Sequence, residues 1–248
     1  MGGWSRELAA GALSKELVFE LLKPLIISPI TTGLNVAVIG PPGVGKSTFC
    51  QNIFVDAYKA GMKCIYVVTG NPIPTVKDQL TELGIPFGGR QDPIVFVDMY
   101  SWLLGERTTE RFQVDNTSDL AALSVVISTA AEAVGDHAFL MFDSLSALPA
   151  YNSEEMCTRF VKSHLARMKK HGNVGVYNVE LGIHREAFYN EIRASFDTVI
   201  EMKMQEVDND VNRMIRVYSH RGVHSSRWFR FQITQDRAVK IGDGTVNK

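Results

Sequence analysis

The segment that most constrains the fold of this chain is a glycine-rich loop between an apolar run and a helical pattern. The run NVAVI (35–39) leads straight into GPPGVGKST (40–48), which satisfies the spacing GxxxxGK[ST]. Such a loop turns tightly, so that consecutive N–H groups point at phosphate oxygens beside the positive end of the next helix. The residues expected to bind phosphate are Gly40, Pro41, Pro42, Gly43, Val44, Gly45, Lys46, Ser47 and Thr48. The loop predicts a nucleotide site, with a plain glycine turn as the alternative.

Three polar residues carry the chemistry expected at this loop. Lys46 is placed to reach the β- and γ-phosphates, and the Ser47 hydroxyl is placed to bind Mg²⁺. Asp143 ends the apolar run AFLMF, a pattern typical of the carboxylate that holds Mg²⁺ through water. Because Asp143-Ser144 also resembles a helix start, capping of the next turn is the alternative role for this acid.

Short apolar runs alternate with helical patterns along the first two hundred residues. The runs cover 35–40, 64–68, 94–98, 138–143 and 174–179, and the helical patterns cover 47–60, 74–83, 118–134 and 153–171. Each run is nearly continuous in apolar residues, as expected of a strand that is covered on both faces. This alternation predicts an α/β fold with a mostly parallel, doubly wound sheet.

The last fifty residues change character, which bears on domain organisation. The runs TVIEM, MIRVYS, WFRFQIT and AVKI are separated by turns too short for helices, so we expect them to extend the sheet as antiparallel strands. Before the first strand, the pattern predicts an amphipathic helix over 7–22 and a proline-containing connector. We therefore expect one domain over 1–248, made of an N-terminal helix and connector (1–32), a parallel core (33–200) and terminal antiparallel strands (201–248).

Composition excludes several classes of protein. Twenty-six Lys and Arg residues against 27 Asp and Glu give a formal charge of −1, so no overall positive field draws the chain to nucleic acid or to an anionic membrane. The longest apolar stretch, 17–30, contains charged residues and a proline and is too short to span a bilayer. The three cysteines lack paired or metal-ligand spacing, so we expect buried thiols in a reduced, cytoplasmic protein.

Motifs that other phosphate-loop proteins require are missing. The sequence has no [NT]KxD string, which leaves guanine recognition unsupported. Ser144 stands directly after Asp143, where an AAA+ ATPase normally has Glu. The arginines are densest among the terminal strands and do not form the long arginine-rich lid of a nucleoside kinase. A RecA-type ATPase is the class that remains.

Five strings together resemble the KaiC-like and RadA-like branch of the RecA superfamily, a group common in archaea. They are GPPGVGKST, IVFVDMYSW, LMFDSLSAL, FDTVIEM and IRVYSHRGVHSSRWFRFQIT, and the resemblance covers about residues 33 to 243. It implies a RecA-like P-loop fold that binds ATP with Mg²⁺. It also implies a homo-oligomeric ring, often of six subunits, with nucleotide at the interfaces.

The same resemblance assigns a role to Arg221 in HRGVH, and one departure accompanies it. Arg221 corresponds to the basic finger that a neighbouring subunit extends toward the γ-phosphate, where it stabilises transition-state charge. The family often has Lys two residues earlier, but this chain has Ser219. One of two expected positive charges is therefore missing, and a solvated turn residue is the alternative for Arg221.

The second departure concerns the base that activates water. Family members that hydrolyse ATP end the second strand with Glu, whereas this chain has Gly70 and Asn71. An amide positions water but is no useful proton acceptor at neutral pH, so hydrolysis through Asn71 alone should be slow. Asp98 and Glu180 lie at strand ends and are the candidate replacements, against capping or ion pairing as alternatives. Asn178 is a candidate polar sensor of the γ-phosphate.

The one basic region, residues 211–240, contains six Arg, one Lys and one Asp, with interleaved aromatic residues. Such a pattern suits single-stranded nucleic acid. It equally suits a charged hairpin or a subunit interface, which we favour. Our main hypothesis is an ATP-binding, nucleotide-dependent switch or weak ATPase with a protein partner still to be identified. The alternatives are a competent ATPase or autokinase, and a recombinase-like mediator on single strands.

Overall fold

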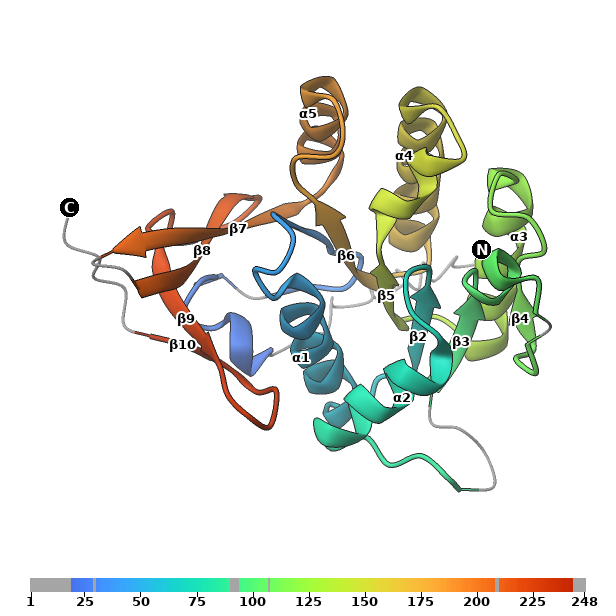
Figure 1. The fold of residues 1–248 in the computed structure, drawn as a ribbon, viewed down its shortest axis with the longest axis horizontal. Helices are drawn as coiled ribbons and strands as arrows, with labels where there is room; N and C mark the ends of the chain where they lie inside the picture. The colour runs from blue at the N-terminus through green and yellow to red at the C-terminus, as the bar shows by residue number, and fades with distance from the viewer. Residues whose placement is uncertain (1–18, 29, 90–93, 107, 208–209, 243–248) are drawn as a thin grey trace, which may run out of the picture.

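The computed structural model describes residues 19–28, 30–89, 94–106, 108–207 and 210–242. Its strands form one sheet in the order β10-β9-β8-β7-β1-β6-β5-β2-β3-β4. Figure 1 shows this sheet running across the molecule with helices above and below it. The α/β class and the mostly parallel sheet predicted from the sequence are confirmed.

The central strands are the apolar runs of the sequence. They are β1 (Asn35–Gly40), β2 (Cys64–Val68), β3 (Ile94–Asp98), β5 (Phe139–Asp143) and β6 (Val174–Glu180), each within one residue of its predicted range. Neighbours among them pair in parallel, and nearly every residue in them is buried, because helices cover both faces. A two-residue strand, β4 (Phe112–Gln113), extends this edge parallel to β3 and was not predicted.

The helices fall into two layers (Figure 1). On one face lie α1 (Lys46–Lys59) and α2 (Ile73–Glu82); on the other lie α3 (Leu120–Val134), α4 (Glu154–Lys170) and α5 (Glu186–Ser195). Side-chain caps fix two of the starts, since Asp119 accepts a hydrogen bond from the N–H of Ala122 and Ser153 accepts one from Met156. Two hydrophobic clusters, one per layer, sandwich the sheet and hold it in place.

Helix α5 was missed by the sequence analysis, and it changes the pairing of the next strand. Its ten residues bury Phe188, Tyr189 and Ile192 on one side, in a segment to which the sequence analysis assigned no element. Because α5 carries the chain across the face of the sheet, β7 (Thr198–Val207) returns parallel to β1. The expectation that TVIEM enters an antiparallel hairpin is correct for its pairing with β8 and wrong for its pairing with β1.

The terminal strands extend the sheet in antiparallel fashion, as predicted. They are β8 (Asp210–His220), β9 (Phe229–Ile233) and β10 (Val239–Ile241). The segment before β1 packs against them: the N–H groups of Ile27 and Ser28 both donate to the carbonyl of Val223.

Most of the helix expected over 7–22 lies outside the described residues. Glu20–Leu22 form a single turn of 3₁₀ helix, η1. Two further 3₁₀ helices follow strands, η2 (Ser101–Leu104) after β3 and η3 (Leu145–Ala150) after β5.

Candidate nucleotide-binding site

The glycine-rich loop joins β1 to α1 at the carboxyl edge of the parallel strands. Gly45 is the residue before α1 and has φ 101°, a conformation that side chains other than glycine disfavour. Gly40 needs to be glycine for space, because a Cβ there would lie 2.8 Å from the carbonyl oxygen of Met202. The loop therefore ends at the positive end of a 14-residue helix, where unpaired N–H groups and the helix dipole favour an anion.

Lys46 is buried at the start of α1, and its ammonium group faces the loop. The Nζ atom donates to the carbonyl of Pro41 at 2.8 Å and lies 3.5 Å from Oε2 of Glu180. Burial lowers the pKa of Lys46, while the Glu180 carboxylate opposes that shift. The lysine is thus positioned at the loop by a carbonyl and a carboxylate, either of which a phosphate oxygen can replace.

Asp143, Ser47 and Asn178 meet beside the lysine. Oδ1 of Asp143 accepts hydrogen bonds from the Ser47 hydroxyl at 3.2 Å and from the Asn178 amide at 2.6 Å, and that amide also reaches Ser47 Oγ at 3.0 Å. Oδ2 accepts a hydrogen bond from the Tyr66 hydroxyl at 3.2 Å. The structure thus brings together the two predicted metal ligands and the predicted sensor.

This cluster fits a hard divalent cation. Burial raises the pKa of the Asp143 carboxyl, and the hydrogen bonds from Asn178, Ser47 and Tyr66 oppose that shift. The buried Oδ1 of Asn178 has no hydrogen-bond partner among the described residues. A carboxylate, a hydroxyl and an unpartnered amide oxygen are oxygen ligands of the type that Mg²⁺ prefers.

The end of β2 carries no carboxylate, as the sequence indicates. Gly70 and Asn71 are both exposed, directly before Pro72 at the start of α2. Thr69, the residue directly after β2, is buried. Its hydroxyl accepts a hydrogen bond from the N–H of Ser144 and donates one to the Ser144 carbonyl. The peptide bond between Asp143 and Ser144 is cis. This strand end therefore supports the backbone after Asp143 and offers no general base.

Of the two replacement bases, Asp98 has the capping role. Its carboxylate accepts hydrogen bonds from the N–H groups of Tyr100 and Ser101 and from the Ser101 hydroxyl, at 2.7 to 3.0 Å. Both oxygens are engaged in starting η2. The structure brings only Glu180 of these two candidates to the lysine.

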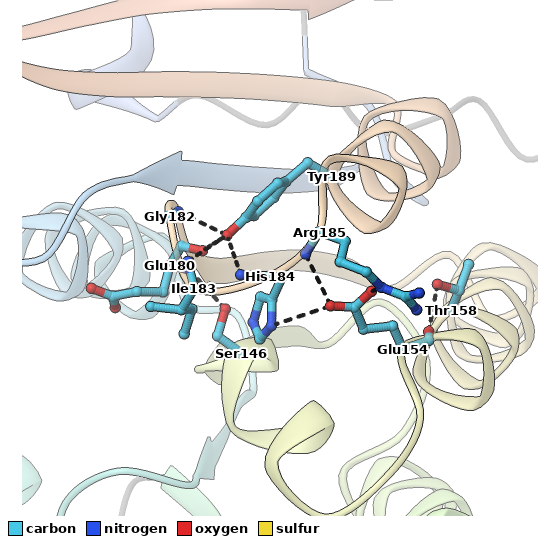
Figure 2. A network of polar contacts seen from close by, with 9 residues as sticks. All are labelled: Ser146, Glu154, Thr158, Glu180, Gly182, Ile183, His184, Arg185 and Tyr189. Atoms are coloured by element: carbon cyan, nitrogen blue, oxygen red, sulfur yellow. Dashed lines mark hydrogen bonds and ion pairs between the residues drawn. The ribbon is translucent and has the colours of Figure 1, made fainter.

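A network of hydrogen bonds fixes the backbone at Glu180 (Figure 2). The Tyr189 hydroxyl donates to the Glu180 carbonyl at 2.8 Å and accepts from the N–H groups of Gly182, Ile183 and His184. The Glu180 N–H donates to Ser146 Oγ at 2.8 Å. The 180–184 backbone is therefore attached to both η3 and α5.

Farther along the same loop, Arg185 joins Glu154 at the start of α4. Its side chain and its backbone N–H both contact the Glu154 carboxylate, with Nε 2.7 Å from Oε2 (Figure 2). Arg185 and Tyr189 were missed by the sequence analysis together with α5. Tyr66 could have been found, because a tyrosine in a strand buried on both faces needs a partner for its hydroxyl.

Arg221 lies at the opposite edge of the sheet from this site. It follows β8, whose last residue His220 pairs with Thr198 at the amino end of β7. The side chain is exposed, and its Nε lies 2.8 Å from Oδ1 of Asp197. The chain's own glycine loop is at the carboxyl edge, so the two predicted parts of the site are not brought together within one chain.

In the basic region, the cations and rings contact one another. Arg216 lies over the rings of Trp228 and Tyr218 and pairs with Glu201 at 2.7 Å, and Lys203 lies 4.3 Å from the centre of the Trp228 ring. These contacts join residues of β7 and β8 to Trp228, the residue before β9.

The family model described as "ATPase: KaiC" matches residues 22–246, nearly the whole chain. The chain belongs to the KaiC family of ATPases. The solved structure of the KaiC-like protein PH0186 from the hyperthermophilic archaea Pyrococcus horikoshii OT3 is similar, with a TM-score of 0.73. At 16% identity, over 93% of this chain and 100% of that one, the likeness shows the fold. No curated protein matches the sequence.

Membership of the KaiC family makes this a nucleotide-binding protein of the RecA superfamily. The loop after β1 and the acid that ends β5 lie at the same carboxyl edge, on either side of β6. Among the described residues, no helix is long and apolar enough to cross a membrane.

Proposed function

We propose that this KaiC-family chain binds ATP with Mg²⁺ and uses it as a nucleotide-dependent switch with weak hydrolysis. The observation that carries the proposal is the pairing of a complete phosphate loop with a second strand that ends in Gly70 and Asn71. Binding and hydrolysis need different residues, and this chain has kept the first set while lacking the usual base.

The phosphate groups are held by the glycine loop and by Lys46. When a triphosphate binds, its oxygens replace the Pro41 carbonyl and the Glu180 carboxylate as partners of the lysine. Ser47 and Asp143 hold Mg²⁺, which when bound neutralises charge on the β- and γ-phosphate oxygens. Asn178, between these two ligands, is placed to sense the cation or the terminal phosphate.

One observation favours a second candidate, a competent ATPase. The Glu180 carboxylate is one-quarter exposed and lies beside the lysine that contacts phosphate. Released from Lys46, it is the one acid of the two candidates that can accept a proton from water near the site. Asp98 is not retained as a base, because its oxygens cap η2.

A homo-oligomer with nucleotide at its interfaces is part of the proposal. Arg221 is exposed at the edge opposite its own glycine loop, so it can act on nucleotide only in a second copy. A contact of this head-to-tail kind closes into a ring when the rotation between copies permits.

Calorimetry with Mg·ATP tests the binding part of the proposal. Lys46→Ala should abolish binding, because it removes the buried cation of the loop, whereas Lys59→Ala, in the exposed last turn of the same helix, should leave affinity unchanged. Equal affinity in wild type and Lys46→Ala would overturn the proposed site.

Phosphate release separates the two candidates. A wild-type rate at or only slightly above that of Lys46→Ala, and unchanged in Glu180→Gln, supports the switch. Turnover that is lost in Glu180→Gln and retained in Asn71→Ala supports the competent ATPase.

A further inference from the structure

A cavity lies between α3 and α4, at the amino edge of the sheet. The two helices are neighbours in the same layer (Figure 1), and the segments that precede β5 and β6 also line the cavity. Its volume is about 370 Å³, in the lower part of the range found for small-molecule sites. The glycine loop is at the carboxyl edge, so this cavity is separate from the proposed nucleotide site.

The walls of the cavity combine apolar groups with charges of both signs. Apolar side chains from both helices form part of the wall: Ile127, Ala131 and Met168. Arg167 of α4 reaches across to α3, where one of its terminal nitrogens donates to the Ser124 hydroxyl. Two carboxylates, those of Glu132 and Asp136, lie on the α3 side. The cavity is therefore amphipathic and has no large excess of either charge.

A chain of hydrogen bonds beside the cavity fixes the protonation of a buried histidine. The Asn35 amide nitrogen donates to the carbonyl of Gly33 at 3.2 Å, so Oδ1 of Asn35 is the atom that accepts from the Tyr177 hydroxyl, also at 3.2 Å. That hydroxyl has one proton, and Nε2 of His164 lies 2.9 Å from its oxygen. Because the Tyr177 proton is already used, Nε2 of His164 must carry a proton and donate it to this hydrogen bond.

The other ring nitrogen of His164 is left as a buried acceptor. Burial lowers the pKa of His164 to about 3, with the Arg167 charge acting in the same direction, so the ring is uncharged at neutral pH and Nδ1 has a lone pair. Nδ1 points away from Tyr177 and has no hydrogen-bond partner in the described part of the chain. Because His164 is only 3% exposed and lines the cavity, this lone pair is available to a molecule inside the cavity.

The chemistry of the walls defines the class of molecule that fits. Arg167 disfavours a cation, and the carboxylates of Glu132 and Asp136 disfavour an anion, so an uncharged molecule fits best. A guanidinium group and a thioether both pack favourably on aromatic rings, which favours a ring beside Arg167 and Met168. A buried acceptor without a partner is unfavourable, so a molecule with an N–H or O–H group gains a hydrogen bond that a plain hydrocarbon does not.

We propose that the cavity between α3 and α4 binds a small, uncharged aromatic molecule with an N–H or O–H donor, which bonds to Nδ1 of His164. The ring of this molecule packs against the apolar wall formed by Ile127, Ala131 and Met168. The site is independent of the proposed ATP binding, because no residue of the glycine loop contributes to it.

Calorimetry with indole, an uncharged aromatic probe with one N–H group, tests the proposal. Indole should bind, and N-methylindole, which lacks the donor, should bind about tenfold more weakly because the hydrogen bond to a buried acceptor is lost. Ala131→Leu fills the cavity and should abolish indole binding, whereas Ala133→Leu, the same change at an exposed position of α3, should match wild type. Excess Mg·ATP should not displace indole.

Each of these measurements can contradict the proposal. Failure of indole to bind at millimolar concentration, equal affinities for the two probes, or indole binding retained in Ala131→Leu would overturn it. Displacement of indole by Mg·ATP would also overturn it, because indole would then be bound at the glycine loop.

NMR of the histidine ring nitrogens tests the hydrogen-bond argument directly. The resonances of His164 are identified by their loss in His164→Leu, and the calorimetry needs no change at this residue should that variant fail to fold. Wild-type His164 should be protonated on Nε2, with an unprotonated Nδ1 whose resonance shifts with indole and much less with N-methylindole. A proton on Nδ1, or an Nδ1 resonance that indole does not shift, would overturn the proposal.

Discussion

The ion pair between Lys46 and Glu180 restrains the lysine that we propose binds phosphate, so removal of this ion pair should tighten nucleotide binding. Glu180→Gln keeps the shape of the side chain and removes its charge. The Nζ–Oε2 distance is 3.5 Å, and a Coulomb estimate at an effective dielectric constant near 20 gives roughly 5 kcal/mol. Partial exposure of Glu180 and the cost of burying both charges reduce this to about 1 to 1.5 kcal/mol.

That free energy corresponds to about tenfold tighter binding of Mg·ATP. The loss of a negative charge near the bound phosphate groups changes the affinity in the same direction. Calorimetry with Mg·ADP and Mg·ATP measures the change directly. Glu155→Gln is the matched control, because Glu155 forms an ion pair with Arg159 in which both side chains are 73% exposed.

Affinity that is unchanged or weaker in Glu180→Gln, with the fold intact by circular dichroism, would refute the reasoning. Such a result would mean that Glu180 positions Lys46 for phosphate and does not compete with phosphate for it. Phosphate release is measured on the same variant, so the two roles of Glu180 are distinguished. Tighter binding indicates that Glu180 restrains Lys46, and lost turnover indicates that Glu180 acts as the general base.

Two further predictions concern the support of the site and the stability of the core. Tyr189→Phe removes one hydroxyl that makes four hydrogen bonds around Glu180. Urea or thermal unfolding should therefore show that the free energy of unfolding falls by about 2 kcal/mol. Nucleotide affinity should change as well, whereas Tyr151→Phe, at an exposed tyrosine, should alter neither quantity. Burial lowers the pKa of His164 from 6.5 to about 3, so the unfolded chain binds a proton below pH 6.5 that the folded chain refuses. Stability should therefore fall by about 2 kcal/mol between pH 7 and pH 5, and urea titrations of His164→Gln should lack this component.

The parts of the fold that the sequence predicts well are those encoded in contiguous residues. A strand buried on both faces shows as an apolar run, so β1, β2, β3, β5 and β6 are placed to within a residue. Helix α5 and the parallel return of β7 depend on a ten-residue amphipathic segment between polar loops. The segment is as long as α2, which was predicted, so the helix itself could have been found. Its effect on topology arises from tertiary packing and could not.

The same distinction holds for the site. The glycine loop, Ser47 and Asp143 follow from local patterns, and the missing carboxylate at Gly70 and Asn71 is visible directly. Contacts between distant segments are not visible in one sequence: Asp98 at a strand end looks as suitable as Glu180, and only the packing shows that one caps η2 and the other meets Lys46. That Lys169 and Arg221 both pair with Asp197 is likewise visible only in the packing.

The segment before β1 determines where an N-terminal truncation of this protein can begin. The motifs begin near residue 33, which invites a shortened version that starts there. Residues 19–32 nevertheless bury five apolar side chains, those of Phe19, Leu22, Leu25, Ile26 and Ile30. At about 2 kcal/mol each, their removal costs on the order of 10 kcal/mol, close to the whole folding free energy of an average domain. A version trimmed to the motifs would therefore lose the hydrophobic core under its own terminal strands, and the smallest practical unit begins before Phe19.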